Sequence, residues 1–167
     1  MNKALDRLYN TSMIIKKASL LVLILLLVSC AAWAWEGTCV AVISGDIIKV
    51  MHGGKAELIK LYGIDCPDRG QAYWVDAKRF TSGMVLEKQV RILPVDNDRF
   101  GNTVAWVYAG GRNLNHDLAG TGLAWHDILN APDNPELKKL QAEAQAGKRG
   151  LWQDPRPTAP WIYRKKK

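Results

Sequence analysis

Five polar residues of this 167-residue chain have types and positions that suit chemistry: Asp46, Lys60, Asp65, Asp68 and Asn102. A carboxylate can ligate a hard cation or accept a proton from water, and a lysine ammonium can bind phosphate. Each residue also has a structural interpretation, because Asp bonds its own backbone in turns and a strand Lys can simply face solvent. The elements that hold these residues decide between the two.

The hydrophobic pattern predicts a barrel of five strands with three helices. Alternation bounded by turn residues indicates strands, and apolar residues at helical spacing indicate helices. Strands are expected at 38–43, 47–51, 56–62, 89–95 and 103–108, and helices at 71–88, 115–120 and from Asn134 to Gly147 or Gly150. Three strands, a helix and two strands is the order of a five-stranded OB-type barrel, so the predicted class is α+β, mainly β-barrel.

This barrel places the polar residues at its turns and strand ends. Asp46 follows the first strand, Lys60 lies on the third, Asp65 and Asp68 come at or after its end, and Asn102 precedes the fifth. The predicted domain covers 35–153, and a Pro/Lys-rich tail over 154–167 is expected to be extended and to wrap the body.

Residues 1–34 are predicted to be a signal peptide or a lipoprotein signal. Lys16 and Lys17 precede an uncharged, Leu-rich run. Ala32-Trp33-Ala34 offers a cleavage site, whereas Leu27-Val28-Ser29-Cys30 is similar to a lipobox in which Cys30 is acylated. An uncleaved membrane anchor is a third alternative. The expected location is therefore periplasmic, secreted or lipid-anchored to a bacterial envelope.

The charge of the chain is concentrated at its two ends. The formal net charge is +7, yet residues 35–155 hold 14 basic and 15 acidic residues. Nucleic-acid binding draws much of its affinity from Lys and Arg that neutralise phosphates. A nearly neutral body with a basic tail argues against tight nucleic-acid binding over the whole surface.

Two cysteines remain in the predicted domain, Cys39 in the first strand and Cys66 after the third. An exported protein permits a disulfide between them. The alternative is two small buried thiols, and the sequence leaves both open.

Four motifs together resemble the thermonuclease family, whose type member is staphylococcal nuclease. They are Gly45-Asp46, the stretch 59–68, the stretch 98–102 and Gly150-Leu151-Trp152. The resemblance covers Cys39 to Trp152 and implies an OB barrel that hydrolyses DNA and RNA with Ca²⁺. It also implies that Asp46, Asp65 and the backbone carbonyl of Cys66 are the metal ligands.

The chain departs from that family at three positions that carry the chemistry. Asp68 stands where the family has Glu, and Lys60 and Asn102 stand where it has Arg. Lys keeps the charge but loses the planar fork, and Asn loses the charge. Ser44 and Ile47 replace the Asp and Thr that the family has beside Gly-Asp, and Phe100 replaces a Tyr. The stretch 125–130 lacks the family's tyrosines, and Trp125 there is either a ring that stacks on a base or a core side chain.

The preferred interpretation is a nuclease-like domain whose degenerate site has weak or no activity and which acts as a binding module. The alternative is an active Ca²⁺-dependent endonuclease with a variant site. The partners considered are single-stranded nucleic acid or another protein, with membrane contact only through a lipid anchor, and the chain is expected to be a monomer. His52, His116 and His126 lack ligand spacing and are interpreted as incidental.

Overall fold

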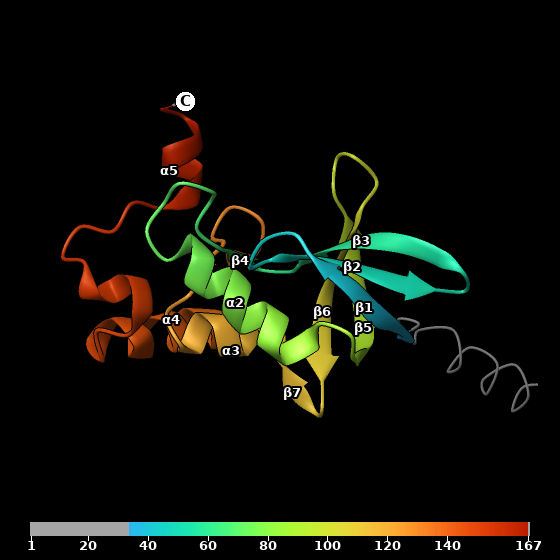
Figure 1. Cartoon of the computed structure of the whole chain (residues 1–167). Coiled ribbons are helices and arrows are strands. Elements are labelled where there is room, and N and C mark those ends of the chain that lie inside the picture. Colours follow the sequence, from blue (N-terminus) through green and yellow to red (C-terminus); the bar gives the residue numbers. More distant parts are fainter. Residues whose placement is uncertain (1–33, 167) are drawn as a thin grey trace, which may run out of the picture. The chain divides into compact units, whose positions relative to one another are not determined.

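Five strands close into a mixed barrel in the computed structural model, which describes residues 34–166 (Figure 1). The strand order is β3-β2-β1-β5-β6, and a parallel pairing of β3 with β6 joins the two edges. All other pairings in the barrel are antiparallel. The barrel strands are β1 (Trp35–Val42), β2 (Ile47–His52), β3 (Lys55–Leu61), β5 (Gln89–Asn97) and β6 (Thr103–Ala109).

Short strands and helices complete the domain. Strand β4 pairs with β8 in a small second sheet, and β7 pairs antiparallel with the end of β6. The short strands are β4 (Ile64–Asp65), β7 (Arg112–Asn113) and β8 (Trp125–His126), and the helices are α2 (Trp74–Val85), α3 (Leu114–Gly120), α4 (Pro135–Ala146), the 3₁₀ turn η1 (Gly150–Gln153) and α5 (Pro160–Arg164). The predicted OB-type α+β fold is confirmed.

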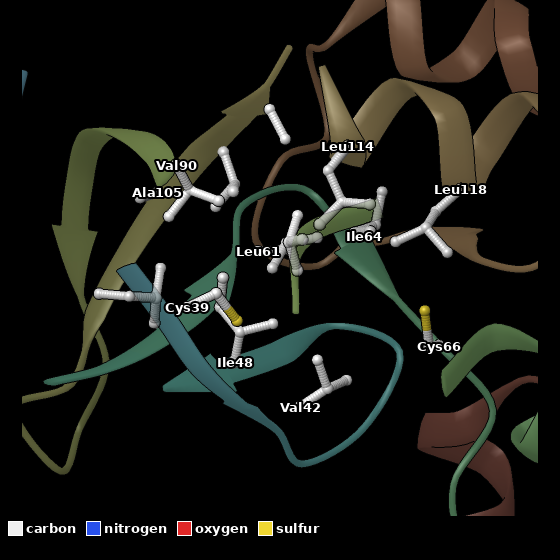
Figure 2. Close-up of a cluster of buried hydrophobic side chains, with 14 of the residues drawn as sticks. Cys39, Val42, Ile48, Leu61, Ile64, Cys66, Val90, Ala105, Leu114 and Leu118 are labelled. Atoms are coloured by element: carbon white, nitrogen blue, oxygen red, sulfur yellow. The ribbon is translucent and has the colours of Figure 1, made fainter. Parts of the chain in front are cut away.

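The core lies inside the barrel and extends under the helices. Ile48, Leu61 and Val90 are buried strand residues, and Leu114 and Leu118 of α3 join the same cluster (Figure 2). Alternating burial along β3 and β6 explains why their strand pattern was readable from the sequence. The polar ends of these strands are consequently held on a rigid frame.

The structure corrects two predicted elements. Helix α2 spans Trp74–Val85 rather than 71–88, because Tyr73 before it adopts a left-handed φ of 62° and Leu86 after it is extended. The Gln71 side chain lies outside the helix and bridges the Asp68 N–H and the Thr158 carbonyl. The tail is not wholly extended, since Pro160 begins α5 at the first helical position.

The two core cysteines are free thiols. Cys39 and Cys66 are both buried, and the Cys39 side chain lies beside Ile48 while Cys66 lies apart from it at the edge of the cluster (Figure 2). Burial raises the pKa of both thiols, at Cys66 together with the nearby charges of Asp46 and Asp65. Of the two alternatives for this pair, the structure has the buried thiols.

The predicted cleavage site, lipobox and Cys30 lie at or before residue 34 and so fall largely outside the described residues. Between residues 34 and 166, the chain has no helix long and apolar enough to cross a membrane.

Candidate active site in the carboxylate cleft

A cleft of about 620 Å³ opens where strands β2, β3 and β6 meet. Carboxylates dominate its charged lining, so we call it the carboxylate cleft. Its charged residues are Asp46, Asp65, Asp68, Asp96, Asp98, Asp127, Lys60, Arg99 and Arg164.

Asp46 is fixed in the turn between β1 and β2. The Ser44 hydroxyl donates a 2.8 Å hydrogen bond to Asp46 Oδ1. The backbone carbonyl of Asp46 accepts a 2.8 Å bond from the N–H of Leu61, which ties this turn to the end of β3. In addition, the Thr81 hydroxyl of α2 donates to the carbonyl of Gly45 at 2.6 Å. The carboxylate is therefore positioned from three elements.

Asp46 and Asp65 form a pair of buried carboxylates, 6% and 5% exposed. Asp65 ends β4, whose pairing with β8 sets it opposite Trp125. Burial raises the pKa of Asp46 to about 6, and the charge of Asp65 adds to that rise. Burial also raises the pKa of Asp65, against the lowering effect of hydrogen bonds from Arg164. Two buried like charges are stable at neutral pH only with cationic compensation.

Lys60 belongs to the cleft and not to the open surface. It lies on β3 at the closure of the barrel, opposite Ile47 of β2 and Val104 of β6. Its side chain is half-buried. Lys60 lines the cleft with Asp46 and Asp65, and its positive charge lowers the pKa of both carboxyls as well as that of Asp98.

Asp68 is paired with a residue from the far end of the chain. Its Oδ2 accepts a 3.1 Å hydrogen bond from Nη1 of Arg164, and its side chain is about one-third exposed. Gln71 fixes the loop, since its backbone N–H donates to the Asp68 carbonyl and its side-chain oxygen accepts from the Asp68 N–H. The Asp68 carboxylate thus reaches the cleft from a constrained loop.

Asn102 does not join the other four residues. Its side chain donates to Asp98 Oδ2 at 2.8 Å, and its N–H donates to Asp98 Oδ1 at 2.9 Å. Asn102 is absent from the cleft lining within the described part of the chain. The structure therefore brings together Asp46, Lys60, Asp65 and Asp68. The Asn102 side chain instead bonds Asp98 within the 98–102 loop.

Sequence reasoning missed Arg164 and Asp127 in the cleft. The only sequence signal for Arg164 was a basic tail expected to wrap the body, which did not distinguish it from its lysine neighbours. Asp127 is buried, and its carboxylate accepts bonds from the N–H groups of Leu129 and Asn130 and from the Asn130 amide. These bonds give Asp127 a turn-forming role.

Trp125 and His126 have structural contacts at the base of the cleft-forming loop 125–130. Trp125 is half-buried and packs edge-on against Trp152 and Trp161, with ring centroids 4.4 and 5.7 Å away. His126 is buried and hydrogen-bonds the Ala131 carbonyl at 2.7 Å. These contacts favour the core interpretation of Trp125.

The donor set fits a hard cation held weakly. Asp46 and Asp65 supply buried carboxylates, and Cys66, the implied source of a carbonyl ligand, follows Asp65 directly. Carboxylate and carbonyl oxygens suit Ca²⁺, which takes six to eight oxygens. Within 34–166, no group of three or more His, Cys, Asp or Glu side chains is placed to hold a metal. Water and substrate oxygens would complete such a site, with Asp65 shared between the cation and the Arg164 guanidinium.

Comparisons with known proteins identify the family of this chain. Residues 58–154 match the model of a family described as staphylococcal nuclease homologue. An uncharacterized endonuclease of Escherichia coli O157:H7 is 38% identical over 134 residues, which is 79% of this chain and 86% of that protein. A micrococcal nuclease of Shigella flexneri is 30% identical over 153 residues, 85% of this chain and 88% of that protein. The chain therefore belongs to the family of staphylococcal nuclease homologues.

Proposed function

We propose that this chain is a phosphodiesterase that cleaves nucleic acid in the carboxylate cleft with the help of a divalent cation. The observation that carries the proposal is the meeting of Asp46, Lys60, Asp65 and Asp68 in one cleft. The names endonuclease and micrococcal nuclease on related proteins support the same chemistry.

Each residue has a defined task in this proposal. Asp46, Asp65 and the Cys66 carbonyl would hold Ca²⁺, which supplies Lewis-acid stabilisation of charge on the phosphoryl oxygens. Lys60 binds a phosphate oxygen through its ammonium group. Asp68 accepts the proton of the attacking water, a task that contributes about 10²–10⁴-fold to rate when the carboxylate is within hydrogen-bond reach.

We propose that this chain cleaves nucleic acid more slowly than a typical member of its family. A shorter acid replaces Glu at position 68, and Asn102 is engaged by Asp98. Loss of one transition-state donor costs about 10²–10³-fold. These two features favour a second candidate function, a nuclease-like module that binds single-stranded nucleic acid or a protein without cutting. We further propose that the protein acts outside the cytoplasm, as its N-terminal sequence predicts.

The decisive experiment is hydrolysis of denatured DNA by the purified protein with excess calcium, and with chelator in a parallel reaction. We expect calcium-dependent cleavage that Asp65→Asn abolishes. Asp96→Asn is the matched control, because Asp96 is an exposed carboxylate at the rim of the same cleft. Absence of calcium-dependent cleavage, together with retained binding of the DNA, would support the binding module instead.

A further inference from the structure

Arg164 enters the carboxylate cleft from the C-terminal helix α5. Its Nη2 lies 2.6 Å from Asp65 Oδ2, and its Nη1 lies 3.3 Å from Asp65 Oδ1. The same Nη1 donates to Asp68 Oδ2 at 3.1 Å. One guanidinium therefore contacts both a proposed metal ligand and the proposed base.

The tail holds this guanidinium in place through its own contacts. Trp161 packs edge-on against Trp125, and the Gln71 amide donates a 2.8 Å bond to the Thr158 carbonyl. Tyr163 approaches the loop so closely that a Cβ at Gly70 would lie 2.7 Å from its hydroxyl oxygen. Because α5 is anchored ahead of Arg164, the guanidinium reaches the cleft from a defined position.

The cleft carries more negative than positive side chains, so a guanidinium in it would favour phosphate binding. Six aspartates line the cleft against three cationic side chains, so its bare charge repels phosphate. Of the other two cations, Lys60 carries an ammonium group that cannot bind two phosphate oxygens in a planar, bidentate way. Arg99 lies over the Phe100 ring, with its Cζ 4.7 Å from the ring centroid. Arg164 is therefore the guanidinium that contacts the carboxylates at the centre of the proposed site.

We propose that Arg164 is a phosphate-binding residue that supplies the guanidinium missing at position 102. A guanidinium carries five N–H donors, and three hydrogen bonds from Nη1 and Nη2 reach Asp65 and Asp68. The side chain is 48% exposed, so its remaining donors are accessible to a nucleic-acid phosphate. Asp65 and Asp68 orient the fork, which then grips phosphate oxygens bidentately. This inference rests on the proposed function.

The test compares Arg164→Gln and Arg164→Lys with Lys165→Gln, which removes a charge from the adjacent, exposed residue. The first measurement is calorimetric binding of thymidine 5′-monophosphate in excess calcium, and the second is cleavage of denatured DNA. We expect Arg164→Gln to lower kcat/KM about 10²-fold and to weaken nucleotide binding at least tenfold. Arg164→Lys should recover part of both losses, and Lys165→Gln should stay within twofold of wild type.

Two results would overturn the inference. Equal nucleotide binding and cleavage by Arg164→Gln and Lys165→Gln would show that Arg164 does not contact phosphate. Tighter calcium binding and faster cleavage by Arg164→Gln would show instead that Arg164 competes with the cation for Asp65. The proposed function fails separately: a wild-type protein that cuts no DNA, yet binds thymidine 5′-monophosphate through Arg164, would refute hydrolysis and keep the phosphate contact.

Discussion

The side chain of Asn102 is committed to Asp98, four residues earlier in the same loop. The amide donates to Asp98 Oδ2, the backbone N–H donates to Oδ1, and the carbonyl of Asn102 accepts from the N–H of Asp98. The hydrogen bonds that the Asp98 carboxylate accepts, first among them the one from the Asn102 side chain, lower the pKa of Asp98. An exposed loop is thereby closed on itself, and position 102 presents no cation to the cleft.

Asn102→Arg should raise the cleavage rate, because it adds a second guanidinium at a position where the family has one. The rate should rise by at most about 10²–10³-fold, the effect on kcat that one hydrogen-bond donor to the transition state typically has. Asn102→Ala is the control, since it also loses the bond to Asp98 but adds no charge. Initial rates on denatured DNA in calcium measure the effect, and equal rates for the two variants would contradict it.

Gly45→Ala should destabilise the fold and disturb Asp46 beside it. A Cβ at this position would lie 2.7 Å from Cys66 Sγ and 2.8 Å from the Ala77 Cβ. Overpacking of this kind costs about 1–3 kcal/mol in the free energy of unfolding. Gly83→Ala is the matched control, because a Cβ there meets nothing within 4 Å and lies inside helix α2. Gly83→Ala should raise the free energy of unfolding by about 0.5–1 kcal/mol. In urea unfolding, Gly45→Ala should therefore be less stable than wild type and Gly83→Ala more stable.

The barrel could be predicted from the sequence because its signals are local. Strands β3 and β6 are short runs of mostly apolar residues that end near turn glycines, Gly63 after β3 and Gly110-Gly111 after β6. Asn134 caps α4 at the N–H of Leu137, as its Asn-Pro-Glu opening indicates. The grouping of Asp46, Lys60, Asp65 and Asp68 came from the resemblance to the thermonuclease family. The strand order alone placed these residues at turns and strand ends but left a turn or surface role open for each.

The remaining features depend on contacts between distant segments. Helix α2 begins after the left-handed Tyr73, and Gln71 ahead of it bonds Thr158 in the tail, a contact that no local pattern contains. The same holds for Arg164, whose partners Asp65 and Asp68 lie almost the whole domain away in sequence. A Pro-rich tail indicated an extended segment, whereas Pro160 in fact begins a helix.

Cys39 and Cys66 should remain unmodified by iodoacetamide in the folded protein and react after unfolding. Both thiols are buried and have raised pKa values, and the thiolate is the reactive form. Peptide mass spectrometry before and after urea treatment measures this directly. Recovery of a Cys39–Cys66 disulfide from non-reduced protein would contradict the prediction.

Asp46→Asn should stabilise the metal-free protein at neutral pH. Burial raises the folded-state pKa of Asp46 from 3.8 to about 6, so the folded state holds this proton more tightly than the unfolded state. The free energy of unfolding of the wild type therefore falls as pH rises from about 4 to 6, by about 3 kcal/mol at most. Asn keeps an oxygen that can accept from the Ser44 hydroxyl and lacks the charge.

In chelator, the variant should be more stable than wild type at pH 8, and the two should converge below about pH 4. Calcium at pH 8 should raise the unfolding temperature of the wild type and leave Asp46→Asn nearly unchanged, because only the wild type gains a ligand for its buried charge. Asp96→Asn, at an exposed position, should track the wild type throughout. Parallel stability curves for wild type and Asp46→Asn across this pH range would show that the buried Asp46 carboxylate is not destabilising in the absence of a cation.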